Sequence, residues 1–370
     1  MTEPGNSNSS FHHEHLAEDG QQLAGEREPA GAFALGLASM RIFSGIQPTG
    51  RKHLGNYIGA IRQYVEGQER GDPAVFCIVD LHAITVAYDP KELRERLYDT
   101  TAILLAAGLD PARCVLFRQS DVHEHTELAW LLGAVCAHGD LNRMHQFKDK
   151  SATQRELVSA GLFSYPVLQA ADVLAYRADE VPVGEDQRQH IELMREIARR
   201  FNERFGQTLT VPDHRIPEIG AKVMDLQEPD RKMSTTVGAD SGRAYLLDEE
   251  KAIRKKFGSA VTDSGREVRR GDDKAGVSNL IGILSVARGI SEDEVESEFE
   301  GKGYGEFKKA VADAVVEFLA PVRDAYPEIR ADEAGLEKIL GEGADRAREI
   351  ASATLADVRA AMGVGVPPGR

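Results

Sequence analysis

The chain has 370 residues, of which 42% are apolar and 28% are charged, and its formal net charge is −15. This composition is typical of a folded globular protein, and the length favours two domains over one. The net acidity excludes a nucleic-acid surface that is basic over the whole molecule, so an RNA partner would need local basic clusters.

The first 39 residues are rich in Gly, Ser, Glu and Gln, which predicts a disordered tail. They lack the basic start of a signal peptide, and no run in the chain reaches the roughly 18–20 apolar residues of a membrane span. The three cysteines form no C-x-x-C pair, which disfavours disulfides and a zinc site and suits the cytoplasm. We expect no metal site, although the histidines of the tail are a weak candidate.

The first ordered element is a short strand that ends at Ser44, and it leads into a glycine-rich loop. The loop is followed by a predicted helix over residues 57–64. Backbone N–H groups at such a helix start attract anions, and glycines let a phosphate approach the backbone. Within this loop His53 and Asn56 lie one turn apart, where both side chains can reach one ligand.

A strand–helix–strand unit comes next. Residues 75–80 form an apolar run typical of a buried strand, Asp89 and Pro90 start a helix that ends at Gly108, and residues 114–117 read as another strand. This pattern predicts an α/β fold with a doubly wound, parallel, Rossmann-type sheet.

The following segments read mostly as helices. Residues 121–138 form a predicted helix around the single tryptophan, Trp130, which either packs against a partner subunit or is fully buried. Residues 162–176 are apolar and aromatic around one carboxylate, Asp172. A strand-like run over residues 181–187 then opens a strongly amphipathic helix.

Residues 206–243 are broken by proline and glycine and predict a long functional loop. From residue 246 onward the sequence reads as helical. We therefore expect a tail over 1–39, a catalytic domain over 40–245 with a helical insertion at about 120–180, and an α-helical domain over 246–370.

The chemistry-bearing residues include no activated nucleophile and no metal-ligand spacing. That absence favours phosphoryl or nucleotidyl transfer, in which a protein positions groups and stabilises charge. His82, His123 and His125 look lone or exposed by their spacing, so we expect them to be structural.

Two short segments resemble the signature motifs of class I aminoacyl-tRNA synthetases. His53-Leu54-Gly55-Asn56 is similar to the HIGH motif, and Lys232-Met233-Ser234-Thr235-Thr236 to the KMSKS motif. Further segments resemble bacterial tryptophanyl-tRNA synthetases, and the likeness covers roughly residues 40–363. These segments are residues 45–50, 80–86, 147–152, 170–172, 181–187 and 301–305.

The resemblance implies a reaction in two steps. Tryptophan would attack ATP to form tryptophanyl-adenylate and pyrophosphate, with Mg²⁺ bound through the nucleotide, and the adenylate would then acylate the terminal adenosine of tRNA-Trp. The catalytic residues implied are His53, Asn56, Lys150 and Lys232, with Lys148 as a further cation. The protein itself would hold no metal.

The resemblance also implies two binding sets. For ATP they are Gln47, Pro48, Thr49, Gly55, Asn56, Gly184, Glu185, Asp186, Val223, Lys232, Met233 and Ser234. For tryptophan they are Phe43, Gln47, His82, Tyr165, Gln169, Asp172, Val183 and Gln187. A tryptophan pocket must offer an acceptor to the indole N–H, and Asp172 is the carboxylate placed to do so.

The chain departs from the family pattern at two positions. Thr235 stands where the second lysine of the KMSKS motif is expected, so one motif cation is missing. Gln169 stands where many relatives carry methionine, which adds a polar group beside the pocket.

Three other functions are open at this stage. The chain could be a paralogue or inhibitor-tolerant isozyme that activates tryptophan, or, less in keeping with residues 184–187, a tyrosyl-tRNA synthetase. A non-catalytic nucleotide- or RNA-binding module would leave His53, Asn56, Lys232 and Asp172 unexplained. The expected partners are tryptophan, ATP, tRNA-Trp and a second copy of the chain in the cytoplasm, with neither DNA nor a membrane. Residues 251–256 and 266–270 are the candidate basic strips for RNA.

Overall fold

The computed structural model describes residues 41–69, 71, 73–144, 158–182, 187–215, 222–235 and 238–365. Residues 39–370 form one compact unit. The expected tail lies outside the described residues, and the expected domain boundary near residue 245 stays a prediction. No helix in the described part is both long enough and apolar enough to cross a membrane.

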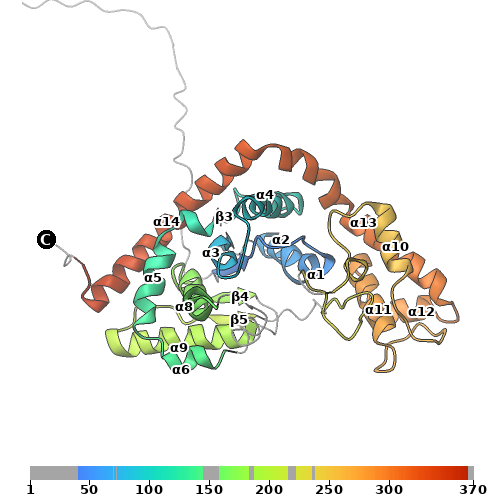
Figure 1. Ribbon diagram of the computed structural model, residues 1–370, viewed down its shortest axis with the longest axis horizontal. Helices are drawn as coiled ribbons and strands as arrows, with labels where there is room; N and C mark the ends of the chain where they lie inside the picture. The colour runs from blue at the N-terminus through green and yellow to red at the C-terminus, as the bar shows by residue number, and fades with distance from the viewer. Residues whose placement is uncertain are drawn as a thin grey trace, which may run out of the picture. The chain divides into compact units, whose positions relative to one another are not determined.

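The strands are all short and lie in one sheet (Figure 1). Their bounds are β1 Ile42–Ile46, β2 Ala74–Ile78, β3 Val115–Arg118, β4 Glu180–Pro182 and β5 Asp213–Arg215. All neighbouring strands are parallel, in the order β3-β2-β1-β4-β5. The doubly wound parallel sheet predicted from the sequence is confirmed.

Helices make up most of the rest. In the first half they are α1 Leu54–Asn56, η1 Tyr57–Ile61, α2 Arg62–Glu69, α3 Asp80–Ala83, α4 Pro90–Ala106, η2 Gln119–Asp121, α5 Glu124–Gly133, α6 His138–Asn142, α8 Ala160–Leu174 and α9 Arg188–Phe205. In the second half they are η4 Asp240–Gly242, α10 Glu250–Gly258, α11 Ala275–Arg288, α12 Glu292–Glu298, α13 Tyr304–Ala331 and α14 Glu333–Met362. The segment η1 is a single π-helical turn, a form often found at functional sites.

Strands β1, β2 and β3 each contribute to two cores, because successive side chains point to opposite faces of a sheet. In β2, Phe76 and Ile78 pack into one cluster with residues of α4, α11 and α13. Val75 and Cys77 pack into the other cluster, with residues of α5, α8 and α9. Burial on both faces explains why this strand reads as a continuous apolar run.

Two predicted elements differ in detail. The helix expected over residues 121–138 is divided, because α5 ends at Gly133 and α6 starts at His138. The region expected to be irregular over 206–243 contains β5, which pairs with β4. This strand has only three residues and lies at the edge of the described sheet, so it has no apolar periodicity to reveal it.

The last helix, α14, runs back from α13 along the sheet and packs on β3, α4 and α5 (Figure 1). Gly343 permits this approach, because a Cβ there would lie 1.8 Å from the carbonyl oxygen of Leu116 in β3. The helix thereby covers the edge strand and contributes residues to both core clusters.

Candidate active site

The strand order places the candidate site at the carboxyl edge of the sheet. The chain winds to one side of β1 through β2 and β3 and to the other side through β4 and β5. Ligands of such sheets bind where the strand order reverses, here between β1 and β4. Gln47 follows β1 at this edge, His82 lies in the helix after β2, and Gln119 follows β3 directly.

A buried lysine, Lys52, holds the first loop, residues 45–53, through hydrogen bonds to its backbone. The side chain of Lys52 is 6% exposed, and its Nζ donates to the carbonyl oxygens of Gln47 at 2.6 Å and Thr49 at 3.3 Å. Burial, with the nearby charge of Arg96, lowers the pKa of Lys52 to about 8, so the amine is mostly protonated at neutral pH. Lys52 therefore braces the segment that includes Pro48. No local pattern distinguishes this residue from an ordinary surface lysine.

His53 and Asn56 are close together, but they have different tasks. Asn56 accepts the backbone N–H of His53 through Oδ1 at 3.0 Å, which leaves its amide nitrogen for a ligand. The His53 ring is 3% exposed, and its Nδ1 has no hydrogen-bond partner among the described residues. A Cβ at Gly55 would lie 3.1 Å from this ring, so any larger residue there would push the ring from its present position.

The electrostatic surroundings keep His53 neutral. Burial lowers its pKa to about 4, and the charges of Lys52, Lys232 and Arg243 add to the effect. A neutral imidazole at physiological pH offers one N–H donor and one acceptor. His53 can therefore stabilise a phosphate oxygen by a hydrogen bond, and the cations around it supply the positive charge.

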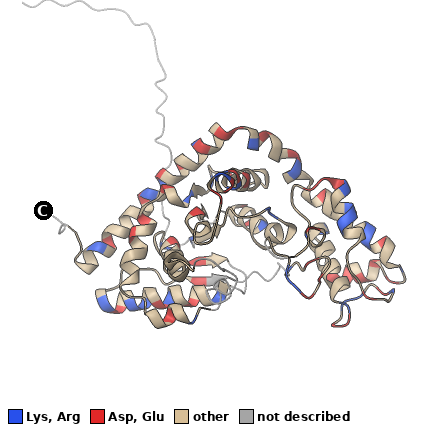
Figure 2. Cartoon of the chain, in the orientation of Figure 1, with Lys and Arg blue, Asp and Glu red and all other residues tan. Residues whose placement is uncertain are grey.

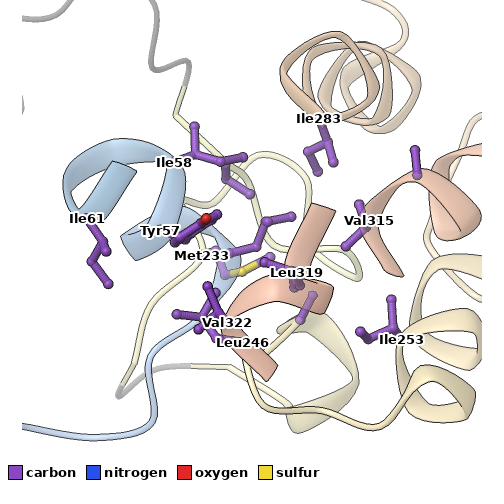
Figure 3. Packing of buried hydrophobic residues seen from close by; sticks show 14 of the residues in the cluster. Tyr57, Ile58, Ile61, Met233, Leu246, Ile253, Ile283, Val315, Leu319 and Val322 are labelled. Carbon is purple, nitrogen blue, oxygen red and sulfur yellow. The ribbon is translucent and has the colours of Figure 1, made fainter. Parts of the chain in front are cut away.

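The signature loop, residues 231–235, forms one side of a small hairpin. The N–H of Asp225 donates to the Arg231 carbonyl at 2.8 Å, and the N–H of Met233 donates to the Val223 carbonyl at 2.9 Å. Met233 is 2% exposed and lies in the apolar cluster with Tyr57 (Figure 3). This buried anchor fixes the loop, because its neighbours must then point away from the core.

The first loop and the signature loop meet although about 180 residues separate them. The side chain of Lys232 is exposed, and its charge acts on His53. A Cβ on Gly50, which has φ of +59°, would lie 3.0 Å from the Cβ of Thr235. A Cβ on Gly55 would likewise lie 3.4 Å from Val223. The first loop and the signature loop are therefore in contact, and the charge of Lys232 reaches His53.

Asp172 lies at the centre of a buried hydrogen-bond network. The carboxylate is 1% exposed. Its Oδ1 accepts from Nε2 of Gln119 at 2.7 Å and lies 2.6 Å from Nδ1 of His125, while Oδ2 lies 2.7 Å from Nε2 of His82. Nε2 of His125 in turn lies 2.6 Å from the hydroxyl of Tyr176. Burial alone would raise the pKa of Asp172, but hydrogen bonding to His125 and the charge and hydrogen bond of His82 hold it below its usual range.

This network corrects the expectation for two histidines. His82 and His125 are neither lone nor exposed, since both are buried and bonded to Asp172. His123 is the exposed one, with 77% of its side chain accessible. Gln119 was missed, although its place directly after β3 could have marked it in the way that His82 is marked after β2.

Two further residues expected to bind tryptophan, Phe43 and Tyr165, contact members of this network. Phe43 stacks on Tyr176 with ring centroids 5.5 Å apart, and the Tyr165 ring meets His82 edge-on at 6.1 Å. The Tyr165 hydroxyl lies 2.8 Å from Nε2 of His190. Gln169 is half-buried on the same helix as Asp172 and Tyr165, and Gln187 precedes α9.

Some predicted residues cannot be placed. Outside the described residues lie Lys148, Lys150, Val183, Gly184, Glu185 and Asp186. Their assignments stay predictions from the resemblance. The described carboxyl edge thus contains part of the candidate ATP set and most of the candidate tryptophan set.

Residues 37–320 match the model of the family described as tRNA synthetases class I (W and Y). The chain belongs to this family. The meeting of the two signature motifs at the carboxyl edge agrees with that membership.

Curated relatives within this family that are similar to the chain include two tryptophan–tRNA ligases. The chain is 47% identical over 328 residues to the tryptophan–tRNA ligase of Wolinella succinogenes, a match that covers 89% of this chain and 100% of the relative. It is 51% identical over 318 residues to tryptophan–tRNA ligase 2 of Streptomyces avermitilis, covering 85% and 94%.

Solved structures agree with these relatives. The tryptophanyl-tRNA synthetase of Mycoplasma pneumoniae matches with a TM-score of 0.83 and 33% identity, over 89% of this chain and 99% of that one. The Campylobacter jejuni enzyme complexed with ADP and tryptophan matches with a TM-score of 0.75 and 35% identity, over 88% and 100%. The tyrosyl-tRNA synthetase of Aeropyrum pernix, at 19% identity and a TM-score of 0.62, shares the fold.

Proposed function

We propose that the chain is a tryptophan–tRNA ligase that forms tryptophanyl-adenylate from tryptophan and ATP and then transfers the aminoacyl group to tRNA-Trp. The observation that carries this proposal is the contact between the first loop and the signature loop. It brings His53 and the charge of Lys232 together beside the crevice of a parallel sheet. We infer the amino-acid substrate, tryptophan, from the names of relatives that are about half identical to this chain.

The adenylation step has the following residue roles. The tryptophan carboxylate attacks the α-phosphorus of ATP, and the bond to the bridging oxygen of pyrophosphate breaks. His53 donates a hydrogen bond to the triphosphate, Asn56 supports it through its amide nitrogen, and Lys232 balances the charge of the leaving pyrophosphate. Mg²⁺ would be carried on the nucleotide and would add charge compensation there. Lys150 is a further proposed cation.

The amino acid would be selected by the network around Asp172. A carboxylate offers about four acceptor positions, and the three observed partners take three of them. One position is left for a donor such as the indole N–H. Tyrosine carries an O–H donor in place of this N–H, so the acceptor alone does not separate the two amino acids, and the choice of tryptophan follows the names of the half-identical relatives.

The test is pyrophosphate exchange into ATP that depends on tryptophan, followed by charging of tRNA-Trp with tyrosine as competitor. The proposal expects exchange with tryptophan and charging that tyrosine does not inhibit. Exchange without charging would identify a tryptophan-activating paralogue instead. Absence of exchange would indicate a non-catalytic nucleotide- or RNA-binding module.

The assembly and location are part of the proposal. Family resemblance and the exposed side chain of Trp130 support a homodimer with tRNA bound across both subunits. The described residues contain no group of three or more His, Cys, Asp or Glu side chains that could hold a metal ion. A cytoplasmic location agrees with the substrates that this reaction needs.

A further inference from the structure

The segment after the signature loop returns to the first loop. The N–H of Leu54 donates to the Ala244 carbonyl at 2.8 Å, and the N–H of Leu246 donates to the Lys52 carbonyl at 3.0 Å. His53 and Tyr245 thus form an antiparallel bridge. Any long side chain placed just before this bridge lies beside the histidine of the candidate active site.

Arg243 is that side chain, and its guanidinium group reaches the tail of the signature loop. Nη1 donates to the Thr235 carbonyl at 3.1 Å and to the Tyr245 hydroxyl at 3.2 Å, and Nη2 donates to the Gly238 carbonyl. The charge of Arg243 is one of those that lower the pKa of His53. A cation is therefore present beside Thr235, where the family pattern places a lysine.

The guanidinium group still has donors to offer. It carries five N–H groups, and the three observed bonds use both on Nη1 and one on Nη2. Nε is buried and has no partner among the described residues. Nε–H and one of the Nη2–H groups share an edge of the planar group, and such an edge can hold two oxygens of a phosphate side by side. A buried donor without a partner is costly, and an anion at this edge would remove that cost.

We propose that Arg243 supplies the second cation of the signature loop, in place of the lysine that Thr235 replaces, and acts on the pyrophosphate that leaves during adenylation. This inference rests on the proposed function. It also accounts for the carbonyl contacts, because they fix the guanidinium at the loop instead of leaving it in solvent. Lys232 and Arg243 then hold the leaving group between them.

The test is a double-mutant cycle in the full chain, measured by tryptophan-dependent pyrophosphate exchange. Arg243→Gln keeps a donor for the carbonyl contacts but removes the charge, and we expect kcat to fall by about 10²-fold with the KM for tryptophan nearly unchanged. Arg243→Lys, which keeps the charge, should lose less than about tenfold. Thr235→Lys should change the wild-type rate little, and combined with Arg243→Gln it should restore at least about tenfold.

The matched control is Arg288→Gln, which also removes one arginine but from an exposed pair with Glu298. It should leave exchange unchanged. Normal exchange by Arg243→Gln would overturn the inference alone. Equal losses of exchange activity in Arg243→Gln and Arg243→Lys, without recovery by Thr235→Lys, would also overturn it. Such a result would indicate that Arg243 only holds the loop in place. Absence of exchange in the unmodified chain would overturn the proposed function and this inference together.

Discussion

At the scale of single residues, different side chains of the site supply hydrogen bonds and positive charge. His53 is buried among cations and stays neutral, while Lys232 and Arg243 provide charge from the signature loop and the segment after it. Asp172 is the reverse case, since its histidine and glutamine partners keep it ionised although it is buried. Each arrangement depends on burial as well as on residue type, because burial amplifies the effect of every neighbouring charge.

The pKa of His53 predicts a loss of stability in acid. Its folded-state pKa of about 4 lies below the ordinary value of 6.5. Stability contributed by the neutral ring is therefore complete above pH 6.5 and is lost as the pH falls toward 4. At pH 5 the loss is about 2 kcal/mol. Urea unfolding at pH 7 and pH 5 should show this loss in the wild type and not in His53→Gln. Equal pH dependence in both proteins would contradict it.

Asp172→Asn should impair tryptophan use more than ATP use. The amide places a donor where histidine or glutamine N–H groups need an acceptor, so we expect a stability loss of about 3 kcal/mol. The remaining acceptor for the indole N–H is also weakened, and kcat/KM for tryptophan should fall by at least about 100-fold. Exchange kinetics with each substrate varied would check this. A KM for tryptophan equal to that of the wild type would count against the acceptor role.

Lys232→Ala should reduce adenylate formation by at least about 10²-fold, because one electrostatic donor to the leaving group is lost. Lys222→Ala is the control, since Lys222 is an exposed lysine that lies ten residues earlier. Pyrophosphate exchange measures both. Only a small effect of Lys232→Ala would end the proposed role of this residue.

At the scale of elements, close backbone contacts decide how the site is built. The hairpin of the signature loop is anchored by Met233, which packs near Leu319 and Val322 of α13 and Leu246 (Figure 3). The first loop is then confined between this hairpin and β1. At the far edge, α14 covers β3 through Gly343. Loss of either contact would disturb a neighbouring element, because packed cores transmit strain.

Replacing two glycines of α14 by alanine should change the stability of the protein in opposite directions. A Cβ on Gly343 would clash with the Leu116 carbonyl oxygen at 1.8 Å, so Gly343→Ala should destabilise the protein by about 2 kcal/mol or more. A Cβ on Gly341 would meet nothing within 4 Å. Gly341→Ala should therefore stabilise the helix by about 0.5–1 kcal/mol. Urea unfolding of both variants checks the pair, and a shift of the same sign in both would refute the packing argument.

At the scale of the whole molecule, Lys and Arg are interspersed with Asp and Glu along most helices (Figure 2). Arg270 bonds with Glu292, Asp293 and Glu296, and Lys256 bonds with Asp248. The two strips expected to meet RNA are thus partly neutralised within the chain. This arrangement explains how an acidic protein can contain such runs without a basic surface.

Trp130 provides the prediction for assembly. Its side chain is 82% exposed, which leaves a large apolar group in water on α5. If the chain forms a dimer through this surface, Trp130→Glu should shift the molar mass in light scattering from dimer to monomer. Val261→Glu is the control at another exposed apolar residue, which is 43% accessible. A wild-type monomer at working concentration would rule out this placement.

The sequence by itself determined the sheet class, the helix started by Asp89 and Pro90, and the pairing of His53 with Lys232 by resemblance. Those features follow from local patterns, such as apolar runs, caps and motif spacing. Only the tertiary structure decided that Lys52 braces the first loop, that His82, His125 and Gln119 converge on Asp172, and that Arg243 lies beside Thr235. The Asp172 contacts join residues 47 to 90 positions apart. Local patterns carry no signal for which polar groups become neighbours once the core excludes water.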